Sequence, residues 1–111
     1  MENKAAIRAF LALGSEPRLN IFRLVVQRGD TGLYPSQIQE LLGLPAATLS
    51  FHLKELIAAD LLTVERESRN LRYRPNAALA GDLVAFLVDN CCGGKPCGVE
   101  VKVPVKFRSR A

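Results

Sequence analysis

Residues 35–61 read PSQIQELLGLPAATLSFHLKELIAADL and contain two helical patterns separated by a very short turn. Proline fits the first turn of a helix and glycine ends helices, so Pro35 or Ser36 opens the first pattern and Gly43 closes it. Pro45 opens the second pattern, which we expect to continue to about Ala59. The apolar side chains of this second segment share one sector of a helical wheel, as expected for the buried side of a helix; they are Leu49, Leu53, Leu56 and Ile57.

The two patterns together have the layout of a helix-turn-helix. The face of the second helix that points away from its apolar sector carries Ala47, Thr48, Ser50, Phe51 and Lys54. Small and polar side chains at the start of a helix fit a DNA major groove, where hydroxyls bond base edges and apolar groups contact thymine methyls. We predict that this face reads DNA, with further contacts from Ser36 and Gln37.

Two aromatic side chains in the second helix have alternative interpretations. Phe51 either faces the DNA or packs against the neighbouring helix. His52 lies at the edge of the apolar sector, so we interpret it as a structural histidine rather than a base contact.

A β-hairpin is predicted directly after these helices. Residues 62–67 and 71–74 alternate in polarity and are joined by Ser68-Arg69-Asn70, in which Asn70 tolerates a left-handed turn conformation. Four arginines lie in this region, and phosphate contacts are expected from Arg66, Arg69 and Arg72, with Arg74 as a further candidate. The alternative is a hairpin whose charges are simply solvated.

Three further helices complete the expected fold. Helix formers at 4–13 predict a first helix, and Ser15 is placed to cap a second that ends near Arg28. Asn76 is placed to cap a last helix that runs to about Asn90 and has a broad apolar surface, which indicates dimerisation. The predicted fold is mainly α, with about five helices and a two-stranded hairpin in the position of a wing.

Composition sets the broad class of the protein. A chain of 111 residues with 49% hydrophobic residues can bury one core. We assign residues 1–90 to a DNA-binding and dimerisation domain and residues 91–111 to a cysteine-containing tail, in which alternating valines predict an edge strand or an extension.

A formal charge of +4 is compatible with a nucleic-acid partner. The sequence shows no membrane-length apolar run and no signal-peptide pattern, so a cytoplasmic protein is expected.

Three cysteines, Cys91, Cys92 and Cys97, lie within seven residues. An odd number in a reducing compartment argues for ligation or thiol chemistry rather than a structural disulfide. Trivalent arsenic or antimony is satisfied by three thiolates, whereas zinc normally needs a fourth ligand such as Asp89, Glu100 or a group from a partner chain. Thiol oxidation, another metal and a tail without a ligand remain alternatives. No general base or anion-binding loop accompanies the cysteines, so an enzyme is not expected.

Residues 12–19 (ALGSEPRL), 47–56 (ATLSFHLKEL) and 59–62 (ADLL) resemble the ArsR/SmtB family of winged helix-turn-helix repressors. The resemblance extends over residues 5–90, although the family often carries histidine at position 51 and glycine at position 60. The vicinal cysteine pair with a third cysteine is similar to the arsenic-repressor subgroup.

This resemblance implies a homodimer, paired through its first and last helices, that binds double-stranded operator DNA. It also implies release of the operator when arsenic(III) or antimony(III) binds as inducer. The alternatives are a redox-controlled or other metal-responsive repressor of the same fold, and a thiol-based arsenic-handling protein.

Overall fold

The structure, a computed structural model, describes residues 1–94. Its contacts form two compact units, one of residues Glu2–Asn76 and one of Met1 with the described residues from Ala77. The boundary expected at residue 90 stays a prediction. Cys97 and the edge strand expected in the tail lie outside the described residues.

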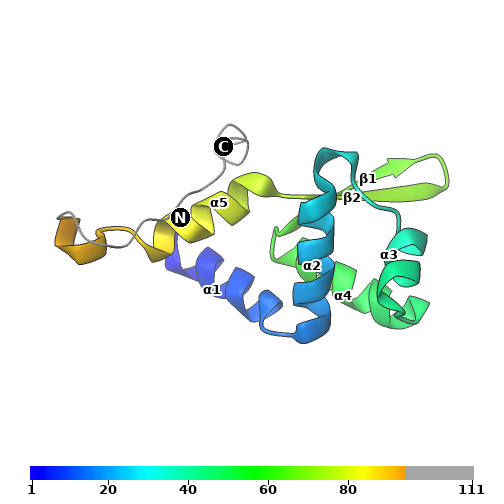
Figure 1. The fold of residues 1–111 in the computed structure, drawn as a ribbon, viewed down its shortest axis with the longest axis horizontal. Coiled ribbons are helices and arrows are strands. Elements are labelled where there is room, and N and C mark those ends of the chain that lie inside the picture. The colour runs from blue at the N-terminus through cyan, green and yellow to red at the C-terminus, as the bar shows by residue number, and fades with distance from the viewer. Residues whose placement is uncertain (95–111) are drawn as a thin grey trace. The chain divides into compact units, whose positions relative to one another are not determined.

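Four α-helices build the larger unit (Figure 1): α1 (Asn3–Leu13), α2 (Glu16–Arg28), α3 (Pro35–Leu42) and α4 (Ala46–Ala58). A short 3-10 helix, η1 (Gly29–Thr31), follows α2. These bounds confirm the helices expected from sequence. Ser15 occupies the N-cap position of α2, although its side chain makes no capping hydrogen bond. Gly43 ends α3 with φ 66°, a conformation that glycine adopts without steric cost.

The core of this unit forms where α1, α2 and α4 pack against one another. The α4 residues Leu49, Leu53 and Leu56 are buried, as the helical wheel predicted. Ile21 and Val25 of α2 are completely buried. Close packing of these aliphatic side chains fixes α4 in the unit and leaves its other face to solvent.

The predicted hairpin is present as β1 (Leu62–Glu67) and β2 (Asn70–Pro75), which pair antiparallel with Glu67 opposite Asn70. Its turn differs from the expectation. Ser68, not Asn70, has a left-handed conformation, with φ 59°. Strand pairing extends to Asn70, so the connection has only two residues, and a positive φ falls at the first of them.

The loop before α3 is fastened to this hairpin, a feature that sequence reasoning missed. Leu33 exchanges two backbone hydrogen bonds with Tyr73, of 2.9 and 2.8 Å. A Cβ at the preceding Gly32, which has φ 72°, would lie 2.8 Å from the carbonyl oxygen of Tyr73. Glycine is therefore required for this close approach between the loop and β2.

The second unit contains α5 (Ala77–Leu87) and a 3-10 helix, η2 (Cys91–Gly94). The last helix thus ends at Leu87, before the predicted end at Asn90. Asn90 has φ 56°, a left-handed conformation that an α-helix does not accommodate, so the chain turns there. Among the helices described, none is long and apolar enough to cross a membrane.

Candidate nucleic-acid interface

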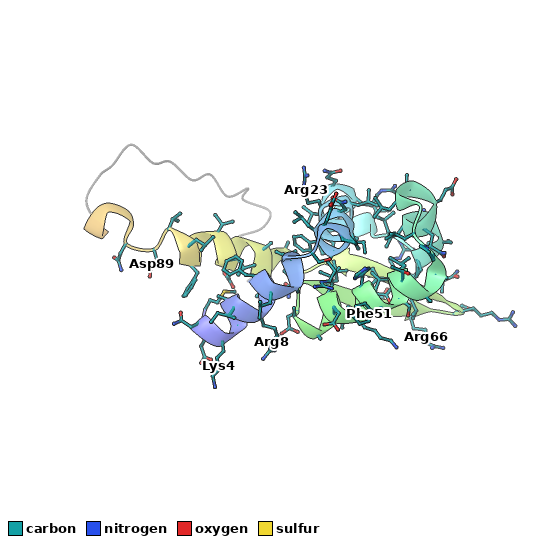
Figure 2. All side chains as sticks on the ribbon, turned by 90° about the horizontal axis from the view of Figure 1, so that it is seen from below. Lys4, Arg8, Arg23, Phe51, Arg66 and Asp89 are labelled. Carbon is teal, nitrogen blue, oxygen red and sulfur yellow. The ribbon has the colours of Figure 1, made fainter. Side chains whose placement is uncertain are left out.

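The outward face of α4 is open to solvent, as predicted. Phe51 is 55% exposed, whereas Leu49 and Leu53 on the opposite face are 1% and 3% exposed. The other predicted reading residues are also exposed: Ala47, Thr48, Ser50 and Lys54. Within the Glu2–Asn76 unit, Figure 2 shows Phe51 and Arg66 on the same side and Arg23 on the other. The apolar ring of Phe51 is therefore available to a partner.

His52 contacts a side chain of the neighbouring helix α2. Arg18 of α2 donates from Nη1 to Nδ1 of His52 at 3.4 Å and from Nε to the carbonyl oxygen of Ala12 at 2.6 Å. The His52 ring in turn meets the Phe51 ring edge-on, with centroids 5.4 Å apart and planes inclined by 62°. A chain of polar and aromatic contacts thus runs from the end of α1 to the exposed face of α4.

Arg72 makes internal contacts instead of projecting freely from the wing. Its Nε and Nη2 donate to the two carboxylate oxygens of Glu67 at 2.9 and 2.8 Å. It also donates to the Tyr34 hydroxyl and the Thr31 carbonyl oxygen, and its guanidinium lies 4.8 Å from the centre of the Tyr34 ring. We call Tyr34, Glu67 and Arg72 the wing clamp. Four of the five N–H groups of Arg72 are used in these bonds, three within the wing clamp and one to Thr31, which leaves little capacity for the predicted phosphate contact.

Hydrogen bonding within the wing clamp changes the acidity of its members. The hydrogen bonds from Arg72 and then Tyr34 lower the pKa of Glu67 from 4.5 to about 2. The Tyr34 hydroxyl donates to Glu67 at 2.7 Å, and this bond raises the pKa of Tyr34. Glu67 also raises the pKa of Arg72. The clamp therefore stays charged and intact across the neutral pH range.

The remaining wing arginines divide into two kinds. Arg74 donates from Nε to the carbonyl oxygen of Asp30 at 2.9 Å and pairs with Glu65 at 3.4 Å. Arg66 and Arg69 are exposed, and within residues 1–94 the recorded ion pairs involve only Arg72 and Arg74 among the wing arginines. Arg66 and Arg69 are thus the wing cations best placed to meet phosphates.

The two α3 residues that were predicted to contact DNA, Ser36 and Gln37, also differ in whether they are free or hydrogen-bonded within the protein. Ser36 is exposed at the start of the helix. Gln37 is half-buried, and its Oε1 accepts a hydrogen bond of 2.9 Å from the backbone N–H of Tyr34. Gln37 therefore helps to satisfy the helix N-terminus, and only its amide N–H groups remain for DNA.

The cysteine cluster is described only in part. The backbones of Cys91 and Cys92 lie in η2, after the end of α5, and Gly93 and Gly94 follow with positive φ of 65° and 84°. Among the side chains that the structure describes, which leave out those of Cys91 and Cys92, no three from His, Cys, Asp or Glu converge as metal ligands. Because Cys97 also falls outside the described residues, the three-cysteine site stays a prediction.

Comparison with known proteins tests the fold and the helix-turn-helix. Residues 13–65, which span α2 to the hairpin, match the helix-turn-helix domain family. The chain is a winged helix-turn-helix protein. Similar solved structures of this fold include an ArsR-like transcriptional regulator from Rhodococcus sp. RHA1, with a TM-score of 0.67 and 24% identity over 76% of each chain. The comparison with curated protein sequences gives no match.

Two further solved structures extend the likeness. HlyU from Vibrio cholerae N16961 has a TM-score of 0.65 and 23% identity, over 83% of this chain and 99% of that protein. The homodimeric winged helix-turn-helix DNA-binding domain of Mb0332 from Mycobacterium bovis has a TM-score of 0.62 and 24% identity, over 86% and 89%. These likenesses confirm the predicted fold class, a winged helix-turn-helix.

Proposed function

We propose that this protein is a transcriptional repressor that binds operator DNA as a homodimer. The observation that carries the proposal is the exposed face of α4, which presents Thr48, Ser50 and Phe51 beside Lys54 while its opposite face is buried. Such a face fits a major groove, and the exposed Arg66 and Arg69 of the adjacent wing supply cations for phosphates. The homodimeric DNA-binding domain of Mb0332 supports the same assembly here.

Fluorescence anisotropy tests the DNA-binding proposal. A duplex from the chain's own promoter is expected to bind at least about a thousandfold more tightly than a random duplex of equal length at physiological salt. Affinity for both duplexes should fall steeply with added salt because bound phosphates release counterions. Equal affinity for the two duplexes at physiological salt would show that the protein does not read sequence.

We further propose that arsenic(III) or antimony(III) is the inducer and is held by Cys91, Cys92 and Cys97. The donor set fits the ligand, since a soft trivalent centre is satisfied by three thiolates and the chain supplies three within seven residues. The position of the cysteine pair beyond the end of α5 supports this, because a 3-10 helix with positive-φ glycines is less constraining than an α-helix. Binding relieves repression if the ligand prefers the conformation that does not bind DNA.

Single replacements of each cysteine by serine separate sensing from DNA binding. Each variant is expected to bind the operator like the wild type, because the reading helix lies in a different unit of the chain. Release by arsenite under reducing conditions should be weakened or lost, because a hydroxyl is a poor ligand for a soft centre. Release of all three variants at wild-type arsenite concentrations would exclude this cluster as the inducer site.

A redox response is the second candidate, favoured by the reactivity of closely spaced thiols and by a reduced form of HlyU among the similar structures. The same titration distinguishes it. Peroxide should release the operator and arsenite should not if the cysteines act as a redox switch. Release by zinc alone would instead indicate a metal-responsive repressor with a fourth ligand.

A further inference from the structure

The exposed stripe of α4 carries only one of the side chains that read purines most strongly, Lys54. Ala47, Phe51 and Lys54 lie along one line of the helix, with Thr48 beside them. Guanine is read by bidentate arginine or lysine and adenine by bidentate asparagine or glutamine. Residues 46–58 contain no arginine, asparagine or glutamine, and the only lysine stands near the end of the stripe. The stripe offers instead a methyl group, a hydroxyl and a phenyl ring.

We propose that Phe51 reads the 5-methyl group of a thymine in each operator half-site. Thymine is the one DNA base that presents a methyl group in the major groove, and an apolar ring is the surface that this methyl favours. Phe51 is 55% exposed, so more than half of its surface is available for this contact. The inference rests on the proposed DNA-binding function and adds the base that is read.

Arg18 and His52 act as positioning residues for this ring. Arginine only donates, so the bond from Arg18 requires His52 to accept at Nδ1 and, when neutral, to carry its proton on Nε2. Arg18 is itself fixed by the carbonyl oxygen of Ala12. The imidazole is therefore restrained on one side and contacts the Phe51 ring edge-on at 5.4 Å on the other. Restraint before binding lowers the entropy lost when the ring docks on DNA.

Replacement of thymine by deoxyuridine tests the methyl contact directly, because it removes only that methyl group. The wild-type protein first selects its preferred duplex from a random library, and each thymine is then replaced in turn. We expect one thymine in each half-site at which the replacement weakens binding about fourfold, and about fifteenfold when both are replaced. Phe51→Ala should weaken binding to the thymine duplex and bind both duplexes equally. Phe51→Leu should keep part of the difference.

Variants of Arg18 and His52 test the positioning role. Arg18→Met and His52→Leu should bring the thymine-to-uracil affinity ratio toward one while the salt dependence of binding stays unchanged, since no phosphate contact is lost. His52→Asn keeps an acceptor near Nδ1 and should restore part of the ratio. Arg23→Met is the matched control, because it removes an exposed arginine of α2 from the side opposite Phe51 (Figure 2).

Three outcomes would overturn the inference. The first is a selected duplex in which no thymine is sensitive to uracil, and the second is a sensitivity that persists in Phe51→Ala. The third is a Phe51→Ala variant that no longer forms a dimer, which would assign the ring to a protein contact. Failure of the wild type to select any sequence would contradict the proposed function itself and is distinguishable from all three.

Discussion

Asp60 shows how a single residue marks the boundary between the reading helix and the wing. It follows α4 with φ 62°, its N–H donates to the carbonyl oxygen of Ile57, and its own carbonyl oxygen accepts from the side chain of Asn76. Only glycine adopts this left-handed conformation without steric cost, and aspartate tolerates it better than most residues. The glycine common at this position in ArsR-type proteins therefore has a backbone reason.

Asp60→Gly is expected to stabilise the fold. Relief of the left-handed strain exceeds the added entropy of the unfolded chain, for a net gain of about 0.5 kcal/mol. Glu40→Gly, in the exposed interior of α3, is the control and should destabilise by about 1 kcal/mol because no strain is relieved there. Urea unfolding followed by circular dichroism measures both changes. A destabilised Asp60→Gly variant would mean that the aspartate side chain makes a stabilising interaction that outweighs the strain.

The hairpin is attached at two places to the segment that precedes α3. Leu33 pairs with Tyr73 at its base, and the wing clamp joins Glu67 and Arg72 to Tyr34 in front of α3. Both attachments hold the wing against the segment that leads into the helix-turn-helix. The exposed Arg66 and Arg69 can meet phosphates reproducibly only if the hairpin is held at a fixed angle.

Arg72→Met should loosen the wing without unfolding the protein. We expect weaker binding to operator and random DNA alike, because Arg66 and Arg69 are no longer held in place. The salt dependence of the affinity should decrease by the amount that corresponds to the loss of about 1 to 2 phosphate contacts. Hydrogen exchange of the hairpin amides should become faster. Arg23→Met, which removes an equal charge from α2, should leave the salt slope unchanged. An unaltered slope with Arg72→Met would mean that the clamp does not position the wing.

The wing clamp also predicts a pH dependence. The pKa of Glu67 is lowered from 4.5 to about 2 in the folded protein. The ionised carboxylate therefore makes its full contribution to stability above pH 4.5. That contribution is lost as the pH falls from 4.5 to about 2. Thermal unfolding of the wild type should therefore show a steeper loss of melting temperature across this interval than Glu67→Gln, which cannot titrate. Parallel curves for the two proteins would contradict the charged clamp.

For the molecule as a whole, assembly is expected to involve α1. This helix buries three alanines, Ala6, Ala9 and Ala12. Its Ile7 and Leu11 are 56% and 71% exposed. Large aliphatic side chains gathered on one exposed helix face are typical of a surface that another chain covers. Dimerisation through this helix, implied by the family resemblance, is thus supported by its exposed apolar residues.

Leu11→Glu should shift the protein toward monomer. A carboxylate left unpaired at a buried interface costs about 3 kcal/mol, and a homodimer buries one from each protomer, so the dissociation constant of the dimer should rise by at least about a hundredfold. Sedimentation equilibrium without DNA measures this constant. Leu41→Glu on α3, where the leucine is 55% exposed, is the control and should leave the assembly unchanged. An unchanged dimer in Leu11→Glu would place the interface away from this part of α1.

Local pattern determined the elements and the exposed face of α4. The period of Leu49, Leu53 and Leu56 separates a buried side from an exposed one, whatever the helix packs against. Pro35, Gly43 and the alternation in the hairpin act within a few residues, so their consequences could be read from the sequence. The resemblance to ArsR-type proteins was carried by these same local segments.

Tertiary structure alone decided which polar side chains remain free for DNA. Arg72 looks like Arg66 and Arg69 in sequence, but it donates a hydrogen bond to Tyr34, 38 residues earlier in the chain. Gln37 is likewise committed to the backbone of Tyr34. A hydrogen bond depends on distance and direction between atoms, and residue order does not fix these until the loop before α3 is paired with β2.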